Sequence, residues 1–91
     1  MSTPFLLGFT RAILRELLSE QLIEVQVGAE DLVIAYVADF LRDMPEGNSL
    51  ISSLARGFIE CPYVDELYAD NHQLKLMVQG LESAALTWTG E

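Results

Sequence analysis

The amino-acid sequence predicts an all-α fold, a compact array of four main helices plus one short helix. Two observations support this prediction. Apolar residues recur at spacings of three and four through most of the chain, which is the spacing of one face of a helix. Proline, glycine and polar capping residues separate these segments from one another. The chain has 91 residues, a length suited to one domain, so we expect residues 1–91 to form a single helical domain.

The first helix is expected from about Pro4 to Glu20. Proline is favoured in a first helical turn, where its missing amide hydrogen is not needed, and Thr3 can serve as the N-cap. A broad apolar stripe runs along this segment and should face the core. Its members are Leu6, Phe9, Ile13, Leu14, Leu17 and Leu18.

Residues 23–27 have the alternation of a strand rather than the period of a helix. Three β-branched residues, Ile23, Val25 and Val27, alternate with polar ones, which predicts a short β-segment. Residues 86–89 alternate in a similar way. The alternative fold class is therefore α+β, with strands at 23–27 and 86–89 that pair with each other or across a dimer.

The second helix is predicted to begin at Gly28 and to end at Met44, because the proline that follows disfavours helical backbone at the residue before it. Residues 44–47, Met-Pro-Glu-Gly, have the composition of a type I turn. Asn48 is the expected N-cap of the third helix. The apolar residues of that helix form two adjacent rows, the pattern of a helix pressed against a core.

Gly57 lies within the third helix, where glycine costs stability relative to alanine. We expect it to permit the close approach of a neighbouring helix.

Residues 60–72 hold the chain's only cysteine and only histidine. Pro62 favours an extended Cys61 and is common at the first helical position, so we predict a short helix over residues 62–68 with Cys61 at its N-cap. Asp70, followed three residues later by Gln73, approximates a capping box that begins the last helix.

Two candidate sites for chemistry fall in this corner. Cys61 is the candidate reactive thiol, since a helix N-terminus lowers a thiol pKa, although neighbouring acidic residues raise it. Asp65, Asp70 and His72 are the candidate metal ligands, although their spacing matches neither a zinc site nor a calcium-binding loop. No hydrolase or phosphate-binding motif is present. We therefore expect no catalytic residues and no cofactor.

The charge balance excludes some classes of partner. Fourteen acidic and five basic residues give a net charge of −9, whereas nucleic-acid-binding proteins depend on clustered lysine and arginine. No apolar run approaches the roughly 20 residues of a membrane span, and the first residues lack the basic start of a signal peptide. A single unpaired cysteine suits a reducing compartment. We expect a cytoplasmic protein that binds neither nucleic acid nor membrane.

The apolar content points to association with a partner. Hydrophobic residues make up 51% of a chain that has little interior to hide them. Arg11 and Arg15 share a helix face, where their mutual repulsion calls for carboxylates from the same chain or from a partner. The interface candidates are Phe5, Phe9, Arg11, Arg15 and Trp88.

The sequence therefore favours a non-enzymatic protein–protein interaction module: a small acidic adaptor, regulator or subunit. Its partner would be another protein or the chain itself, as a homo-oligomer. The alternative is a small thiol- or metal-dependent protein that uses the corner from Cys61 to His72.

Overall fold

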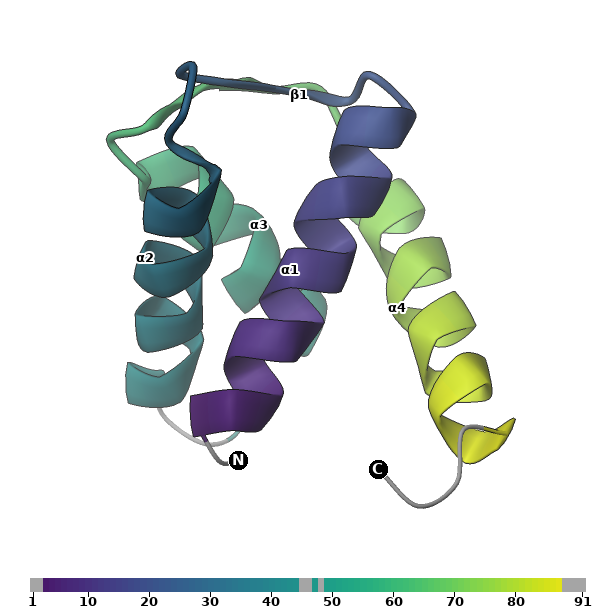
Figure 1. Cartoon of the computed structure of the whole chain (residues 1–91). Helices are drawn as coiled ribbons and strands as arrows, with labels where there is room; N and C mark the ends of the chain where they lie inside the picture. Colours follow the sequence, from purple (N-terminus) through teal and green to yellow (C-terminus); the bar gives the residue numbers. More distant parts are fainter. Residues whose placement is uncertain (1–2, 45–46, 48, 88–91) are drawn as a thin grey trace.

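Four helices and a two-stranded antiparallel ribbon make up the fold (Figure 1). The computed structural model describes residues 3–44, 47 and 49–87, with side chains placed for residues 4–44, 47 and 49–81. The four predicted main helices are confirmed, and the β-segment predicted over residues 23–27 is confirmed over Ile23–Val25. The elements are α1 (Thr3–Ser19), β1 (Ile23–Val25), α2 (Glu30–Asp43), α3 (Leu50–Glu60), β2 (Val64–Leu67) and α4 (Asn71–Thr87).

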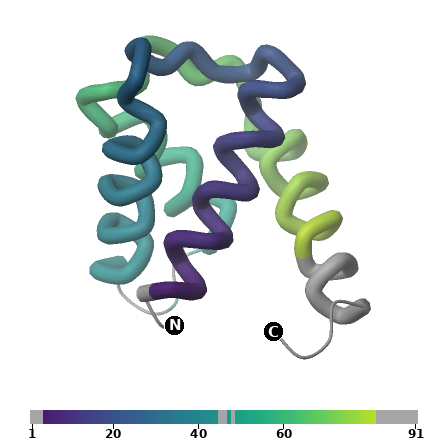
Figure 2. Tube along the Cα trace, in the orientation of Figure 1, coloured from purple at the N-terminus to yellow at the C-terminus, as the bar shows by residue number. Residues whose placement is uncertain are grey.

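The chain is arranged as two successive helix–strand–helix units, α1–β1–α2 and α3–β2–α4. The ribbon formed by β1 and β2 crosses one end of the helix array, as Figures 1 and 2 show. The first turn of α1 and the last turn of α4 lie at the opposite end of the array. Each strand thus obtains its hydrogen-bonding partner from the other unit, and the ribbon ties the two units together.

The strand β2 replaces the short helix predicted over residues 62–68, and that prediction is wrong. Ile23 pairs with Leu67 and Glu24 with Glu66, and the pairing of Val25 with Val64 follows a bulge. A helix of seven residues is unstable alone, whereas these residues can pair with the otherwise open edge of β1.

The alternative prediction of a strand over residues 86–89 is also wrong for the two of these residues that the structure describes. Leu86 and Thr87 belong to α4, and β1 pairs with β2 instead. Trp88 and Thr89 lie outside the described residues.

The second helix begins two residues later than predicted. Gly28 has a φ of 75°, a left-handed conformation suited to the turn before α2 rather than to a helix. α2 ends at Asp43, and Met44 is extended with φ −71° and ψ 139°, as expected before a proline.

The third helix is capped by Ser49, whose hydroxyl oxygen accepts a hydrogen bond from the amide of Ser52 at 3.3 Å. The predicted cap, Asn48, lies outside the described residues, as do two residues of the predicted 44–47 turn.

The core lies between the four helices and beneath the ribbon. Its largest fully buried side chain is Phe58 of α3. A Cβ added to Gly57 would lie 3.3 Å from Val37 Cγ1 and 3.2 Å from Phe40 Cδ1, both on α2, which confirms that this glycine permits close helix packing. Core residues from every helix include Ile13, Leu17, Val33, Val37, Leu54, Phe58, Leu74 and Val78.

Candidate functional site

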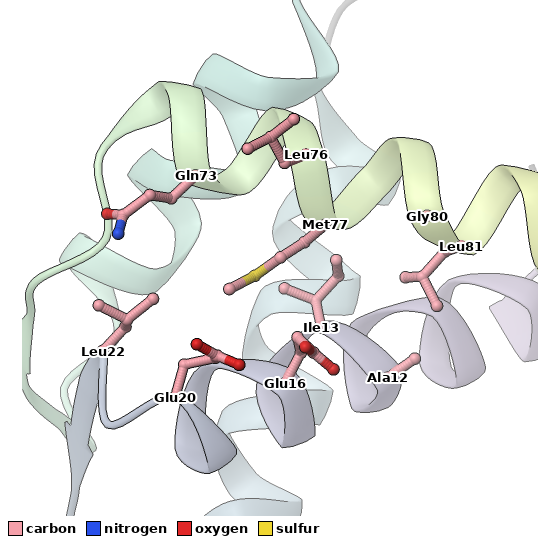
Figure 3. Close-up of a pocket in the computed structure, with 10 residues that line it drawn as sticks. All are labelled: Ala12, Ile13, Glu16, Glu20, Leu22, Gln73, Leu76, Met77, Gly80 and Leu81. Atoms are coloured by element: carbon pink, nitrogen blue, oxygen red, sulfur yellow. The ribbon is translucent and has the colours of Figure 1, made fainter.

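A groove lies between α1 and α4 (Figure 3). Its volume is about 550 Å³, which falls within the roughly 300–1,000 Å³ of typical binding pockets. The lining residues come from α1, from the segment before β1 and from α4. They are Ala12, Ile13, Glu16, Glu20, Leu22, Gln73, Leu76, Met77, Gly80 and Leu81.

The groove exists because small residues lie where larger side chains would fill it. Gly80 lies within α4 and has no atom within 4 Å of the position that a Cβ would take. Ala12 presents only a methyl group from α1. Figure 1 shows the backbones of α1 and α4 diverging away from the ribbon end.

The floor of the groove is apolar. Ile13 is fully buried, Met77 and Leu81 are half-buried, and the Leu76 side chain is 54% exposed. In Figure 3 the Met77 side chain extends from α4 towards α1, where Ile13 projects. Methionine is flexible and polarisable, so it adapts well to the shape of a bound apolar group.

Two glutamates form an acidic rim on the α1 side. Glu16 and Glu20 are one helical turn apart, and both are exposed. Within the described side chains, neither carboxylate has a salt-bridge partner, and no basic residue lines the groove. Like charges at this spacing repel each other, so the rim favours a cation from outside the chain.

Two of the predicted interface residues, Phe5 and Phe9, lie on α1 towards its N-terminus, and neither lines the groove. Phe9 precedes Ile13 by one turn, and Phe5 precedes Phe9 by one turn, so all three lie along one side of the helix. The Phe5 and Phe9 rings are stacked, with centroids 6.1 Å apart and an interplanar angle of 8°. The Phe5 side chain is 55% exposed.

The predicted arginine pair lies on another part of α1. Arg11 and Arg15 are exposed, and neither forms a salt bridge with the residues that the structure describes. Each lies five residues before one of the rim glutamates, which places it roughly 140° around the helix. Trp88, the last of the predicted interface residues, lies outside the described residues.

Cys61 is buried at the C-terminal end of α3, and not at the N-cap of a helix as predicted. Its amide donates a hydrogen bond to the carbonyl of Phe58 at 3.3 Å. Burial raises the pKa of the Cys61 thiol, and hydrogen bonds from the backbone of Tyr63 and Val64 offset part of that rise. The position therefore lacks the helix N-terminus that would stabilise a thiolate.

The three candidate metal ligands are all exposed, and one of them has a structural role. Asp70 Oδ1 accepts a hydrogen bond from the amide of Gln73 at 2.8 Å, and Gln73 Oε1 accepts one from the amide of Asp70 at 2.9 Å. This reciprocal pair confirms the predicted capping box. Asp65 lies in β2 and His72 in the first turn of α4. Throughout the described part of the chain, no three His, Cys, Asp or Glu residues gather closely enough to hold a metal ion.

Sequence reasoning missed the groove, although two of its signals were visible. Gly80 interrupts an otherwise good helix, and Glu16 and Glu20 lie near the C-terminal end of α1, where the helix dipole disfavours negative charge. Only the placement of α4 beside α1 brings these residues together.

No protein-family model, curated protein or solved structure matches the chain. Among the described residues, no helix is both long enough and apolar enough to cross a membrane. The groove must therefore be interpreted from its own geometry and charge.

Proposed function

We propose that the protein is a non-enzymatic interaction module that binds a partner protein in the groove between α1 and α4. One observation carries this proposal: an apolar floor that includes an exposed leucine, Leu76, lies beside a rim of carboxylates with no salt-bridge partner in the described structure. Exposed apolar surface bordered by polar residues is typical of protein interaction sites.

The lining favours a protein partner over a small metabolite. Among the side chains that the structure describes, Gln73 is the only polar one in the lining apart from the two rim glutamates. Small-molecule sites generally combine an apolar wall with several polar groups placed to fix the ligand's orientation. A partner that packs apolar side chains on Leu76, Met77 and Leu81 needs fewer such groups. We assign the protein the role of a small cytoplasmic adaptor, regulator or subunit.

The proposal is tested by photo-crosslinking from the groove in cells that express the protein. A photoreactive amino acid replaces Leu76, and the crosslinked adducts of this protein are compared with those of two versions that each carry one further substitution. Gly80→Leu adds a side chain within the groove, whereas Gly8→Leu adds the same side chain to an exposed glycine of α1 that lies one turn before Ala12 and does not line the groove. Neither glycine has an atom within 4 Å of an added Cβ, so the two substitutions are matched in their local space.

We expect a defined protein adduct that is lost with Gly80→Leu and retained with Gly8→Leu. Circular dichroism and urea unfolding of both variants confirm that they are folded. An adduct insensitive to Gly80→Leu, or the lack of any adduct in the original background, would contradict binding in the groove.

A further inference from the structure

We infer that the occupant of the groove is an amphipathic α-helix of another protein, with two lysines or arginines about one turn apart along the edge of its apolar face. This inference rests on the proposed function and specifies the chemistry of the partner. It is carried by the backbone of the groove walls, by the charge of the rim and by the dimensions of the lining.

The groove walls require a partner whose backbone is already hydrogen-bonded. Both walls are helices, in which the backbone groups bond within the element, and no residue of β1 or β2 lines the groove. An extended peptide would therefore bury amide and carbonyl groups without partners. A helix satisfies its own backbone and can place its apolar face on the groove floor.

The charge of the groove selects a basic partner. The carboxylates of Glu16 and Glu20 are separated by four residues, a rise of about 6 Å along α1. Two cations one turn apart on a helix lying alongside α1 match that separation. The net charge of −9 also attracts a basic partner and opposes close approach of a second copy of the chain.

The described arginines do not neutralise the rim. Arg42 pairs with Asp39 and Asp43, and Arg56 pairs with Glu60 at 2.6 Å, all on α2 or α3. Arg11 and Arg15 lie on another part of α1, and neither lines the groove. Lys75, the remaining basic side chain, lies exposed on α4, forms no salt bridge with the residues that the structure describes and does not line the groove. A bound basic helix can therefore supply the countercharge for the rim.

The groove sets the length of the contact. The lining extends from Ala12 of α1 to Glu20, the residue that follows α1, and from Gln73 to Leu81 on α4. Each span covers a rise of about 12 Å, which corresponds to two to three helical turns. A partner helix that presents apolar residues at positions i, i+3 or i+4, and i+7 fits this length.

The inference is tested with two synthetic helical peptides that share one leucine face. One has two lysines spaced by four at its edge, and the other has two glutamates there. Each is titrated into the ¹⁵N-labelled full chain at low and moderate salt, and amide shifts are followed by NMR. We expect the lysine peptide to shift Gln73, Leu76 and Met77 and to bind more weakly as salt is raised.

Two pairs of charge-neutralising variants provide the matched comparison. Glu16→Gln with Glu20→Gln should weaken binding of the lysine peptide about three- to thirtyfold, the range expected for two exposed ion pairs. Asp65→Asn with Glu66→Gln changes the net charge equally but alters β2, outside the groove, and should leave most of the affinity intact.

Failure of this inference can be distinguished from failure of the proposed function. If both peptides bind the groove equally, or if the Glu16 and Glu20 variants bind normally, the basic-helix inference is overturned while groove binding stands. Sedimentation that shows self-association, abolished by Gly80→Leu but not by Gly8→Leu, would assign the groove to a second copy. If the amide chemical shifts of the groove residues do not change when the lysine peptide is added, and no crosslinked adduct forms from position 76, both the basic-helix inference and the proposed binding function would be overturned.

Discussion

Thr10 shows how a single residue in α1 departs from good packing. Its side chain is fully buried, and Oγ1 has no hydrogen-bond partner within the described part of the structure. A buried hydroxyl without a partner has lost its hydrogen bonds to water without replacement. The Thr10 side chain therefore packs in the core by its shape, but its hydroxyl group has no hydrogen-bond partner among the described residues.

Thr10→Val should stabilise the fold, because valine keeps the branched shape and removes the hydroxyl. We expect the free energy of unfolding to rise by about 1 to 3 kcal/mol in urea denaturation. Thr10→Ser, which keeps the hydroxyl and removes the methyl group, should lower it. A loss of stability with valine would indicate that the hydroxyl has a partner after all.

The second residue-scale prediction concerns Cys61 and pH. Its thiol is buried and its pKa is raised from the ordinary value of 9.0, so the folded state favours the neutral form. The stability contributed by the neutral thiol is present below that value. It is lost as pH rises from about 9 through the higher pKa of the folded state.

Alkylation of Cys61 should therefore be much slower in the native protein than in the urea-unfolded chain at pH 8. The difference in rate should narrow as the pH approaches the raised pKa. A native rate equal to that of the unfolded chain would show an accessible thiol, and would favour the alternative of a thiol-dependent protein.

Among the elements, α4 depends on the cap formed by Asp70 and Gln73. Asp70→Ala removes the carboxylate that accepts the Gln73 amide, so we expect a loss of about 0.5 to 2 kcal/mol in the free energy of unfolding. Asp65→Ala, at an exposed position in β2, is the matched control and should change it by less. Equal effects of the two substitutions would mean that the cap contributes nothing specific.

The helical glycines give a second prediction at this scale. Gly80→Ala adds a methyl group in open space and should stabilise α4 by up to about 1 kcal/mol. Gly57→Val places a larger side chain against Phe40 and Val37, and should cost about 1 to 3 kcal/mol through overpacking. Thermal and urea unfolding of both variants check this contrast, and a stabilising Gly57→Val would contradict the close packing of α2 and α3.

The sequence predicted the elements whose signals are local. Apolar periodicity predicted the four helices, and the Asp70 and Gln73 pattern predicted the cap of α4. The helix predicted over residues 62–68 is wrong because the strand conformation of residues 64–67 depends on pairing with β1, about 40 residues earlier in the chain. A single sequence shows the residues of each strand but does not show which two strands pair.

For the whole molecule, the groove is a property of arrangement rather than of any one segment. Glu16 and Glu20 could be seen as an unfavourable helix end, and Gly80 as a weak point of α4, without any indication that they border one space. The contact of α1 with α4 turns these local departures from good helix design into a common surface. Such departures are expected where function, rather than stability, determines the residue.

Binding in the groove requires an apolar side chain of the partner to enter between α1 and α4. The most direct test is methyl NMR of Met77 in the presence of the lysine-edged peptide. We predict intermolecular contacts between the Met77 Cε methyl and the peptide's leucines, present with Gly8→Leu and lost with Gly80→Leu. A Met77 methyl that shows no contact with the peptide, while the peptide binds elsewhere on the chain, would contradict binding in the groove.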